Sequence, residues 1–295
     1  MLSFLLDPFH YDFFVRGLVV ATVAGGLCGM VGTFIVMRRM SYIGHGLSHS
    51  VFGGAVVSYV MGWNFYLGAG LWGFISAVLI SWTARRRQIG ADAAIGIVTT
   101  ASFAIGVAII SKARRFTKNF DAALFGNILG VQPEDVFVVL GVTVLVAIVI
   151  FFAYKQLLFM TFDREVAPLY GIPDRWMDTL LSLILAATVI ASMQILGVTM
   201  IAAIIVVPAV TARLLTDSFA HLLLMATAIG TLCGLVGMLL AYYLDVAPGA
   251  TIVLTAASIF MLTLTATSAR KRLQTERARG RSVIESAGSG SFERR

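Results

Sequence analysis

The sequence predicts an all-α fold: a polytopic helical membrane protein with about eight or nine transmembrane helices and one re-entrant segment. Hydrophobic residues make up 59% of the 295 residues and charged residues only 13%, against about 25% charged in soluble domains. The apolar residues form continuous runs of about 20 residues, the length that crosses a bilayer as a helix. Outer-membrane barrels instead show short alternating segments. The 28 glycines fit membrane helices, in which glycine is frequent.

Several apolar runs make up the first part of the chain. The run 13–37 predicts a spanning helix, which Arg38 and Arg39 end, and its Gly25 and Gly29 have the spacing that lets membrane helices approach closely. Runs at 45–63 and 65–83 follow, and Asp92 is placed to cap a further helix at 93–110. The semi-apolar stretch 120–131 is too short to cross the membrane, so we expect it to be re-entrant or interfacial.

The second part of the chain is divided by a polar segment. Pro133 suits the first turn of a strong span that ends near Tyr154. The largest non-membrane segment between spans, 155–178, follows it. Further runs then occupy 179–196, 197–215, 219–244 and 251–269. Pro208 should break or kink the helix that contains it.

The positive charge is concentrated at the C-terminus. Residues 270–295 carry eight Lys and Arg against three Glu, which accounts for most of the net charge of +7. Basic residues favour the cytoplasmic side, so we expect a cytoplasmic C-terminus and an outside N-terminus, with the basic cluster 112–118 as the misfit. We predict a transmembrane domain at 1–270 and a basic tail at 271–295 that is disordered beyond about Thr275. The tail is expected to contact a partner protein or anionic membrane lipid, and not nucleic acid.

Two histidines stand out in the stretch 42–50, YIGHGLSHS. His45 and His49 lie four residues apart, so on a helix they share one face. Histidines inside a membrane protein are costly to bury and are functional candidates, and imidazole is a common ligand of divalent transition metals. The pair therefore predicts a metal site, although two histidines are an incomplete ligand set. The alternative is a pair of hydrogen-bonded packing residues.

The chain contains none of the common nucleotide or hydrolase motifs. It has no phosphate-binding GxxxxGK[ST] loop, no HExxH, no GxSxG and no dinucleotide glycine pattern. We therefore predict that the chain is not an enzyme. If it moves a solute, the energy comes from an ion gradient or from a separate ATPase subunit. The runs are almost free of Asp and Glu, which favours the ATPase.

The polar segment fits such a partner. It contains the sequence 161–173, TFDREVAPLYGIP. The residues Asp163, Glu165, Ala167 and Gly171 give it a pattern that resembles the cytoplasmic coupling loop of ABC-importer permeases, in which a short helix docks into the ATPase. An ordinary connector helix is the alternative.

Several stretches together resemble the permease subunit of the zinc/manganese/iron class of ABC importers. The stretch 44–50 is similar to the family's Gly-Asp-Ala-x-Ser-His-Ala. The other stretches appear in family order: 92–97 (DAAIGI), 124–131 (LFGNILGV), 208–215 (PAVTARLL) and 249–254 (GATIVL). The resemblance covers about residues 10–270 and makes residues 1–270 a permease domain. It implies a multi-pass protein of the bacterial cell (inner) membrane.

The resemblance also implies partners and a site. It implies a permease homodimer, cytoplasmic ATPase subunits and an extracytoplasmic metal-binding protein that delivers zinc, manganese or iron, with no permanently bound cofactor. The family's metal-site His matches His49, but its Asp position is His45. Because imidazole replaces a hard carboxylate, zinc is favoured over manganese. Asp245, just past a span, is a further candidate ligand, with a solvated loop Asp as the alternative.

Two other functions stay open from the sequence. A gradient-driven metal carrier would share the histidines but need no ATPase, and co-purification with an ATP-hydrolysing subunit separates the two. A structural or signalling membrane protein would make the histidines packing residues, and loss of metal-dependent growth on deletion would argue against it.

Overall fold

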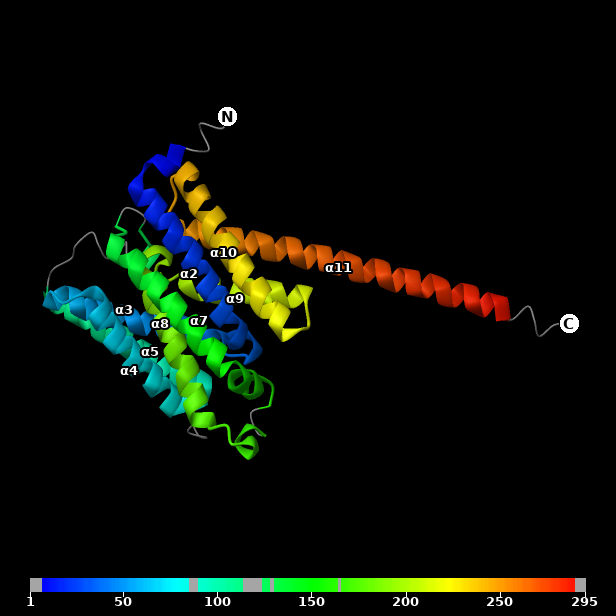
Figure 1. Ribbon diagram of the computed structural model, residues 1–295, viewed down its shortest axis with the longest axis horizontal. Helices are drawn as coiled ribbons and strands as arrows, with labels where there is room; N and C mark the ends of the chain where they lie inside the picture. The colour runs from blue at the N-terminus through cyan, green and yellow to red at the C-terminus, as the bar shows by residue number, and fades with distance from the viewer. Residues whose placement is uncertain (1–6, 85–89, 114–123, 128–129, 164–165, 290–295) are drawn as a thin grey trace.

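The computed structural model describes residues 7–84, 90–113, 124–127, 130–163 and 166–289. Every regular element within these residues is helical, which confirms the predicted helical membrane protein (Figure 1). The elements are η1 (Asp7–His10), α2 (Asp12–Met37), α3 (Ser41–Met61), α4 (Phe65–Ala84), α5 (Ala91–Ala113), α7 (Pro133–Phe162), η2 (Ala167–Tyr170), α8 (Asp174–Leu196), α9 (Ile201–Leu215), α10 (Phe219–Leu244) and α11 (Pro248–Ser289).

Seven of the described helices are long and apolar enough to cross a membrane: α2, α4, α5, α7, α8, α10 and α11. The helix α3 has 21 residues, but polar Ser and His side chains lower the hydropathy of its first turns. The helix α9 has 15 residues, which rise only about 23 Å against a hydrocarbon core of about 30 Å. With the 21-residue α3, the seven candidate spans make eight long helices among the described residues, against the eight or nine predicted, and α9 is too short to span unaided.

The helices around the polar segment are longer than their apolar runs. The helix α7 continues past Tyr154 to Phe162, and α8 begins at Asp174 instead of near residue 179. Hydropathy misses the end of α7 because Lys155 and Gln156 are exposed there, while Leu157 and Met160 are buried. Pro133 does lie in the first turn of α7, where Gln132 and Asp135 form a reciprocal capping box.

The chain breaks between α8 and α9 at Gly197, and not at Pro208 within α9. The helix α9 runs through Pro208, so the chain does not break there, and a kink at Pro208 stays a prediction. The chain turns instead at Gly197, whose φ of 73° lies in the left-handed region that glycine tolerates. Thr199 supports this turn, because its hydroxyl donates to the carbonyl of Leu124 at 2.8 Å. A Cβ atom at Gly126 would collide with the carbonyl of Ile195, so the segment at Leu124 packs tightly on the turn. The rest of the predicted re-entrant stretch lies largely outside the described residues, and re-entry stays a prediction.

A glycine seam joins α2 and α10 in antiparallel orientation. The ring of Phe14 packs on Tyr242 at 5.1 Å between centroids, and Phe34 packs on Phe219 at 5.2 Å, so the start of one helix lies beside the end of the other. A Cβ atom at Gly25 or Gly29 would collide with backbone carbonyls of α10, which confirms the predicted close approach. We call the two ends of the bundle the Tyr242 end and the Arg38 end.

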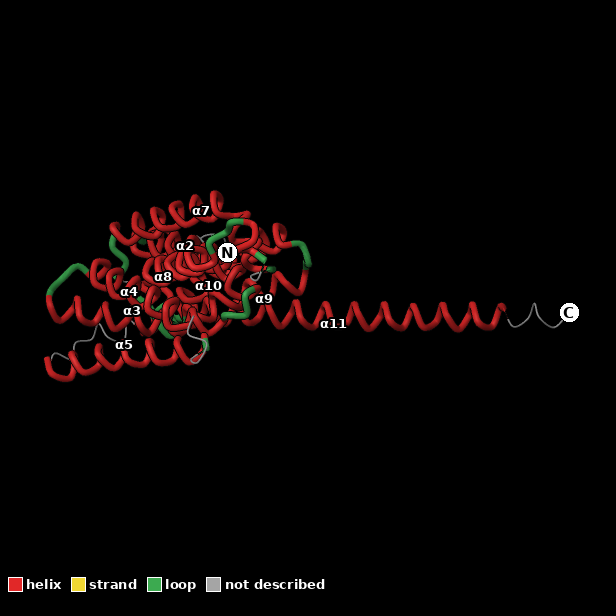
Figure 2. Tube along the Cα trace, turned by 90° about the horizontal axis from the view of Figure 1, so that it is seen from below, coloured by secondary structure: helices red, strands yellow, loops and turns green. Residues whose placement is uncertain are grey.

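The helices fall into groups around this seam. In both views α3, α4 and α5 lie together on one side, and α11 leaves the bundle on the opposite side (Figures 1 and 2). The helix α11 has 42 residues and runs to Ser289, and the disorder expected beyond about Thr275 stays a prediction. Good helix formers such as Lys, Arg, Leu and Gln dominate its continuation. The division into a permease domain and a tail stays a prediction.

Candidate functional site

The two histidines lie on one face of α3, as their spacing predicts. Their ring centroids are 4.6 Å apart and the ring planes meet at 78°. His49 also packs edge-on against Phe103 of α5, with centroids 5.3 Å apart. His45 is exposed and His49 is half-buried. The pair is therefore open on one side, so the imidazoles are accessible to an ion and are not sealed in the core.

A close approach of α3 and α5 positions the pair. A Cβ atom at Gly46 would lie 2.7 Å from the Thr99 hydroxyl and would also collide with the side chain of Ile95. The absence of a side chain at residue 46 thus brings α5 against the helical turn between the two histidines. Ser48 is turned away from the pair and donates to the carbonyl of His45 at 2.8 Å.

The histidines line a cavity of about 610 Å³ between α3 and α5. The lining residues are Tyr42, His45, Gly46, His49, Asp92, Ile95, Gly96, Thr99, Thr100 and Phe103. Asp92 is the acidic side chain among them, and it was expected only to cap a helix. It lies instead inside the first turn of α5, because that helix starts at Ala91 and Gly90 accepts its first backbone bond. The cavity therefore combines two imidazoles, one carboxylate and two threonine hydroxyls.

This ligand set is incomplete in one copy of the chain. Among the described residues no group of three or more His, Cys, Asp or Glu side chains lies close enough to hold a metal ion. Two imidazoles with water or a further ligand bind an ion less tightly than the four protein ligands of a structural zinc site. An open pair of this kind suits an ion that must leave again.

In the folded chain Asp245 and the His45–His49 pair lie in different parts of the helix bundle. It ends α10 at the Tyr242 end, is exposed and has a left-handed φ of 53°. The pair belongs to the first turns of α3, which begins directly after the Arg38 end of α2. One copy of the chain therefore does not bring Asp245 together with His45 and His49, and its metal-binding role stays a prediction.

The predicted coupling segment forms a surface connector between α7 and α8. Asp163 ends α7, and its carboxylate accepts a bond from the backbone of Val166 at 3.2 Å. Ala167 is buried at the start of η2, and Gly171 ends that short helix with a φ of 73°. Glu165 lies outside the described residues. Leu169 and Tyr170, which sequence reasoning did not single out, are 83% and 72% exposed and give the connector an apolar tip.

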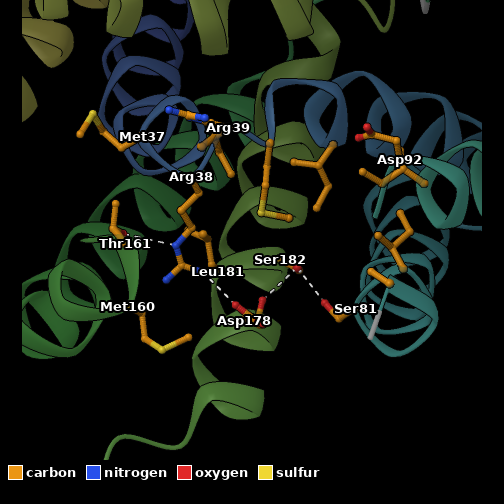
Figure 3. Close-up of a pocket in the computed structure, with 16 residues that line it drawn as sticks. Met37, Arg38, Arg39, Ser81, Asp92, Met160, Thr161, Asp178, Leu181 and Ser182 are labelled. Atoms are coloured by element: carbon orange, nitrogen blue, oxygen red, sulfur yellow. Dashed lines mark hydrogen bonds and ion pairs between the residues drawn. The ribbon is translucent and has the colours of Figure 1, made fainter. Parts of the chain in front are cut away.

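A second cavity lies at the Arg38 end, next to this connector (Figure 3). Its volume is about 450 Å³, and Asp92 and Ile95 line it as they line the histidine cavity. Arg38 and Asp178 form an ion pair in its wall at 3.0 Å. The two cavities therefore share the first turn of α5, and Asp92 is common to both.

This fold and site define a polytopic helical membrane protein with a half-open imidazole site and an exposed connector. A family model described as the ABC 3 transport family matches residues 10–267. The chain belongs to this family and is the membrane subunit of an ABC transporter, and not itself the ATPase. Both the helical membrane fold and the predicted family are thereby confirmed.

Individual relatives agree over nearly the whole chain. The manganese transport system membrane protein MntC of Halalkalibacterium halodurans is 35% identical over 88% of this chain and 90% of its own length. The manganese import system permease protein ScaB of Streptococcus gordonii is 37% identical over 87% of this chain and 91% of its own. In the structure of PsaBC from Streptococcus pneumoniae in complex with Fab, the matching chain has a TM-score of 0.80 and 33% identity, covering 89% of this chain and 95% of that one.

Proposed function

We propose that this chain is the permease of an importer that carries a divalent transition metal ion into the cytoplasm. The observation that carries the proposal is the half-open His45–His49 pair, which lines a cavity with Asp92. Membership of the ABC 3 transport family supports ATP as the energy source, supplied by a cytoplasmic ATPase subunit. An extracytoplasmic metal-binding protein delivers the ion.

The permease works as a homodimer. In one copy the histidine cavity opens to the outside of the helix bundle, and its ligand set is incomplete. A second copy packed on the α3–α5 face would enclose the cavity and double the number of imidazoles. The ion is then held between the two copies by side chains that each contributes.

The Arg38 end is the cytoplasmic end. Arg38 and Arg39 lie there, together with the connector whose exposed Leu169 and Tyr170 suit docking into an ATPase groove. The ion enters at the Tyr242 end, where Asp245 meets it first, and pauses at the histidine pair. It then passes Asp92 into the cavity at the Arg38 end. The extension of α11 beyond the bundle supports a contact of the basic tail with the ATPase or with anionic lipid.

The identity of the ion rests on the ligands and on the relatives. An imidazole at residue 45 favours zinc over manganese, whereas the relatives' names give manganese. Both ions bind imidazole and carboxylate ligands, and competition between them in an uptake assay decides which ion the importer prefers.

Reconstitution of the complex tests the proposal. The chain, its ATPase subunit and the delivery protein are placed in proteoliposomes, and Zn²⁺ and Mn²⁺ uptake is measured with and without ATP. We expect uptake that needs both ATP and the ATPase subunit and that survives collapse of the proton gradient. Uptake by the permease alone, driven by an imposed gradient, would contradict the proposal and favour a gradient-driven carrier.

A further inference from the structure

A buried ion pair joins three helices at the Arg38 end. Arg38 ends α2, and its guanidinium donates to the Asp178 carboxylate of α8 at 3.0 Å and to the Thr161 hydroxyl of α7 at 3.3 Å. The side chains of Arg38 and Asp178 are only 7% and 16% exposed. A pair shielded to this extent is costly to separate, because each charge would lose its partner without full hydration.

The pair is part of a larger hydrogen-bonded chain (Figure 3). Ser182 donates to the backbone carbonyl of Asp178 at 3.0 Å, and Ser81 of α4 donates to Ser182 at 2.8 Å. Thr161 in turn donates to the carbonyl of Leu157 within α7, at 2.6 Å. The connected polar groups thus come from α2, α4, α7 and α8.

Both partners of Arg38 flank the coupling segment. Thr161 lies two residues before Asp163, where α7 ends, and Asp178 lies in the second turn of α8, after the connector. A displacement of the connector is therefore passed directly to the two groups that hold the guanidinium.

Arg38 is also joined by a short, defined turn to the helix that carries the histidines. Only Arg39 and Met40 separate it from the start of α3. Arg39 has a left-handed φ of 58°, which is uncommon for a residue with a side chain, and Met40 donates its backbone N–H to Ile35 at 3.0 Å. A movement of Arg38 therefore reorients the first turns of α3, where His45 lies.

We infer that the Arg38–Asp178–Thr161 cluster is the mechanical link between the ATPase-docking connector and the histidine site. The inference rests on the proposed function. Arg38 does not touch the ion and acts as a positioning residue: it conveys the movement of the connector to α3 and so opens the histidine cavity towards the cytoplasm. Without the cluster the ATPase still hydrolyses ATP, but the hydrolysis no longer moves the ion.

The test measures metal uptake and ATP hydrolysis in the same reconstituted complex. Asp178→Asn keeps the shape of the side chain and removes its charge, and Thr161→Ala removes one hydroxyl. We expect each variant to assemble and to hydrolyse ATP, with the Zn²⁺ or Mn²⁺ taken up per ATP falling about tenfold for Asp178→Asn and less for Thr161→Ala. Asp178→Glu, which retains the charge, should recover part of the loss.

The matched control is Asp217→Asn, an exposed carboxylate between α9 and α10 at the same end of the bundle, which should leave uptake per ATP within about twofold. Wild-type uptake per ATP in both Asp178→Asn and Thr161→Ala would overturn the inference. If Asp178→Asn does not assemble, wild-type uptake per ATP in Thr161→Ala alone would overturn the inference. A wild-type complex that shows no ATP-dependent uptake would instead overturn the proposed function.

Discussion

Two seams in this protein use glycine in different ways. Along α2–α10, Gly25 and Gly29 face backbone carbonyls of the partner helix, and Gly230 and Gly234 return the contact, so a Cβ atom on any of them would strike main chain. Along α3–α5 the contact is mixed: a Cβ atom at Gly46 would strike the side chains of Ile95 and Thr99, whereas a Cβ atom at Gly53 would strike the backbone carbonyl of Ser102. The first seam is closed by backbone contacts, whereas the second is closed at Gly53 and leaves the histidine cavity beside Gly46.

The two seams therefore serve different purposes: the α2–α10 seam stabilises the fold, and the α3–α5 seam serves transport. Backbone against backbone has no freedom to adjust, so the α2–α10 seam fixes the two helices as one rigid unit. At Gly46 the α3–α5 contact is made by side chains, so the two helices can shift locally around the histidine cavity more readily than where backbone meets backbone. Substitutions that treat the two seams alike should therefore have unequal effects.

The largest effect is expected from Gly29→Ala. The new Cβ atom collides with the carbonyl of Ala226, and because neither backbone can move aside, the variant should lose about 1–3 kcal/mol of stability or more. Thermal unfolding of the detergent-solubilised protein measures the loss. Gly141→Ala is the matched control, because a Cβ atom there meets nothing within 4 Å and alanine favours the helix by about 1 kcal/mol. Equal melting temperatures for the two variants would show that the α2–α10 seam is not tightly closed.

Gly46→Ala should act on transport more than on stability. The added methyl group meets the side chains of Ile95 and Thr99, which are β-branched and rarely change rotamer in a helix, so α5 has to shift locally and the cavity beside His45 and His49 changes shape. We expect a smaller fall in melting temperature than for Gly29→Ala, together with a clear fall in metal uptake. A variant that is as unstable as Gly29→Ala yet transports normally would contradict this view of the α3–α5 seam.

His45→Asp should change the preference between zinc and manganese and leave the fold intact. His45 is exposed, so the substitution leaves stability within about 0.5 kcal/mol. A carboxylate beside His49 favours manganese over zinc relative to the wild type, and uptake with the two ions in competition measures the shift. An unchanged preference would exclude residue 45 from the ligand shell.

The smallest effect is expected from Asp245→Asn. Asparagine tolerates the left-handed backbone at this position, so the turn after α10 is retained. Because Asp245 lies at the Tyr242 end and not beside the histidines, we expect the metal concentration for half-maximal uptake to rise about twofold with an unchanged maximal rate. Complete loss of uptake in a folded variant would move Asp245 into the central site.

The sequence predicted those features that depend on local composition. Continuous apolar runs located the long helices, the spacing of Gly25 and Gly29 indicated a close helix contact, and the four-residue spacing of His45 and His49 placed both rings on one face. Pairings between distant residues were not predictable in this way. Arg38 and Asp178 are 140 residues apart, and hydropathy places each merely at the end of a span.

The features that the sequence did not locate correctly can also be explained in physical terms. Asp92 reaches the histidine cavity only because Gly46 lets α5 lie against α3, which one sequence does not reveal. The boundary predicted between residues 196 and 197 is found at Gly197, where packing against Leu124 supports the turn, whereas the chain does not break at Pro208, which is accommodated within α9. The ends of α7 and α8 were missed because hydropathy follows the membrane, while backbone hydrogen bonding continues beyond it.

The most direct test of the central claim is ATP-dependent metal uptake by the reconstituted complex with His49→Ala. His221→Ala is the matched control, since His221 is an exposed histidine in the first turn of α10. If His49 holds the ion on its route, His49→Ala assembles with the ATPase but takes up neither Zn²⁺ nor Mn²⁺, while His221→Ala transports like the wild type. Normal uptake by His49→Ala would show that the ion does not pass through the histidine cavity.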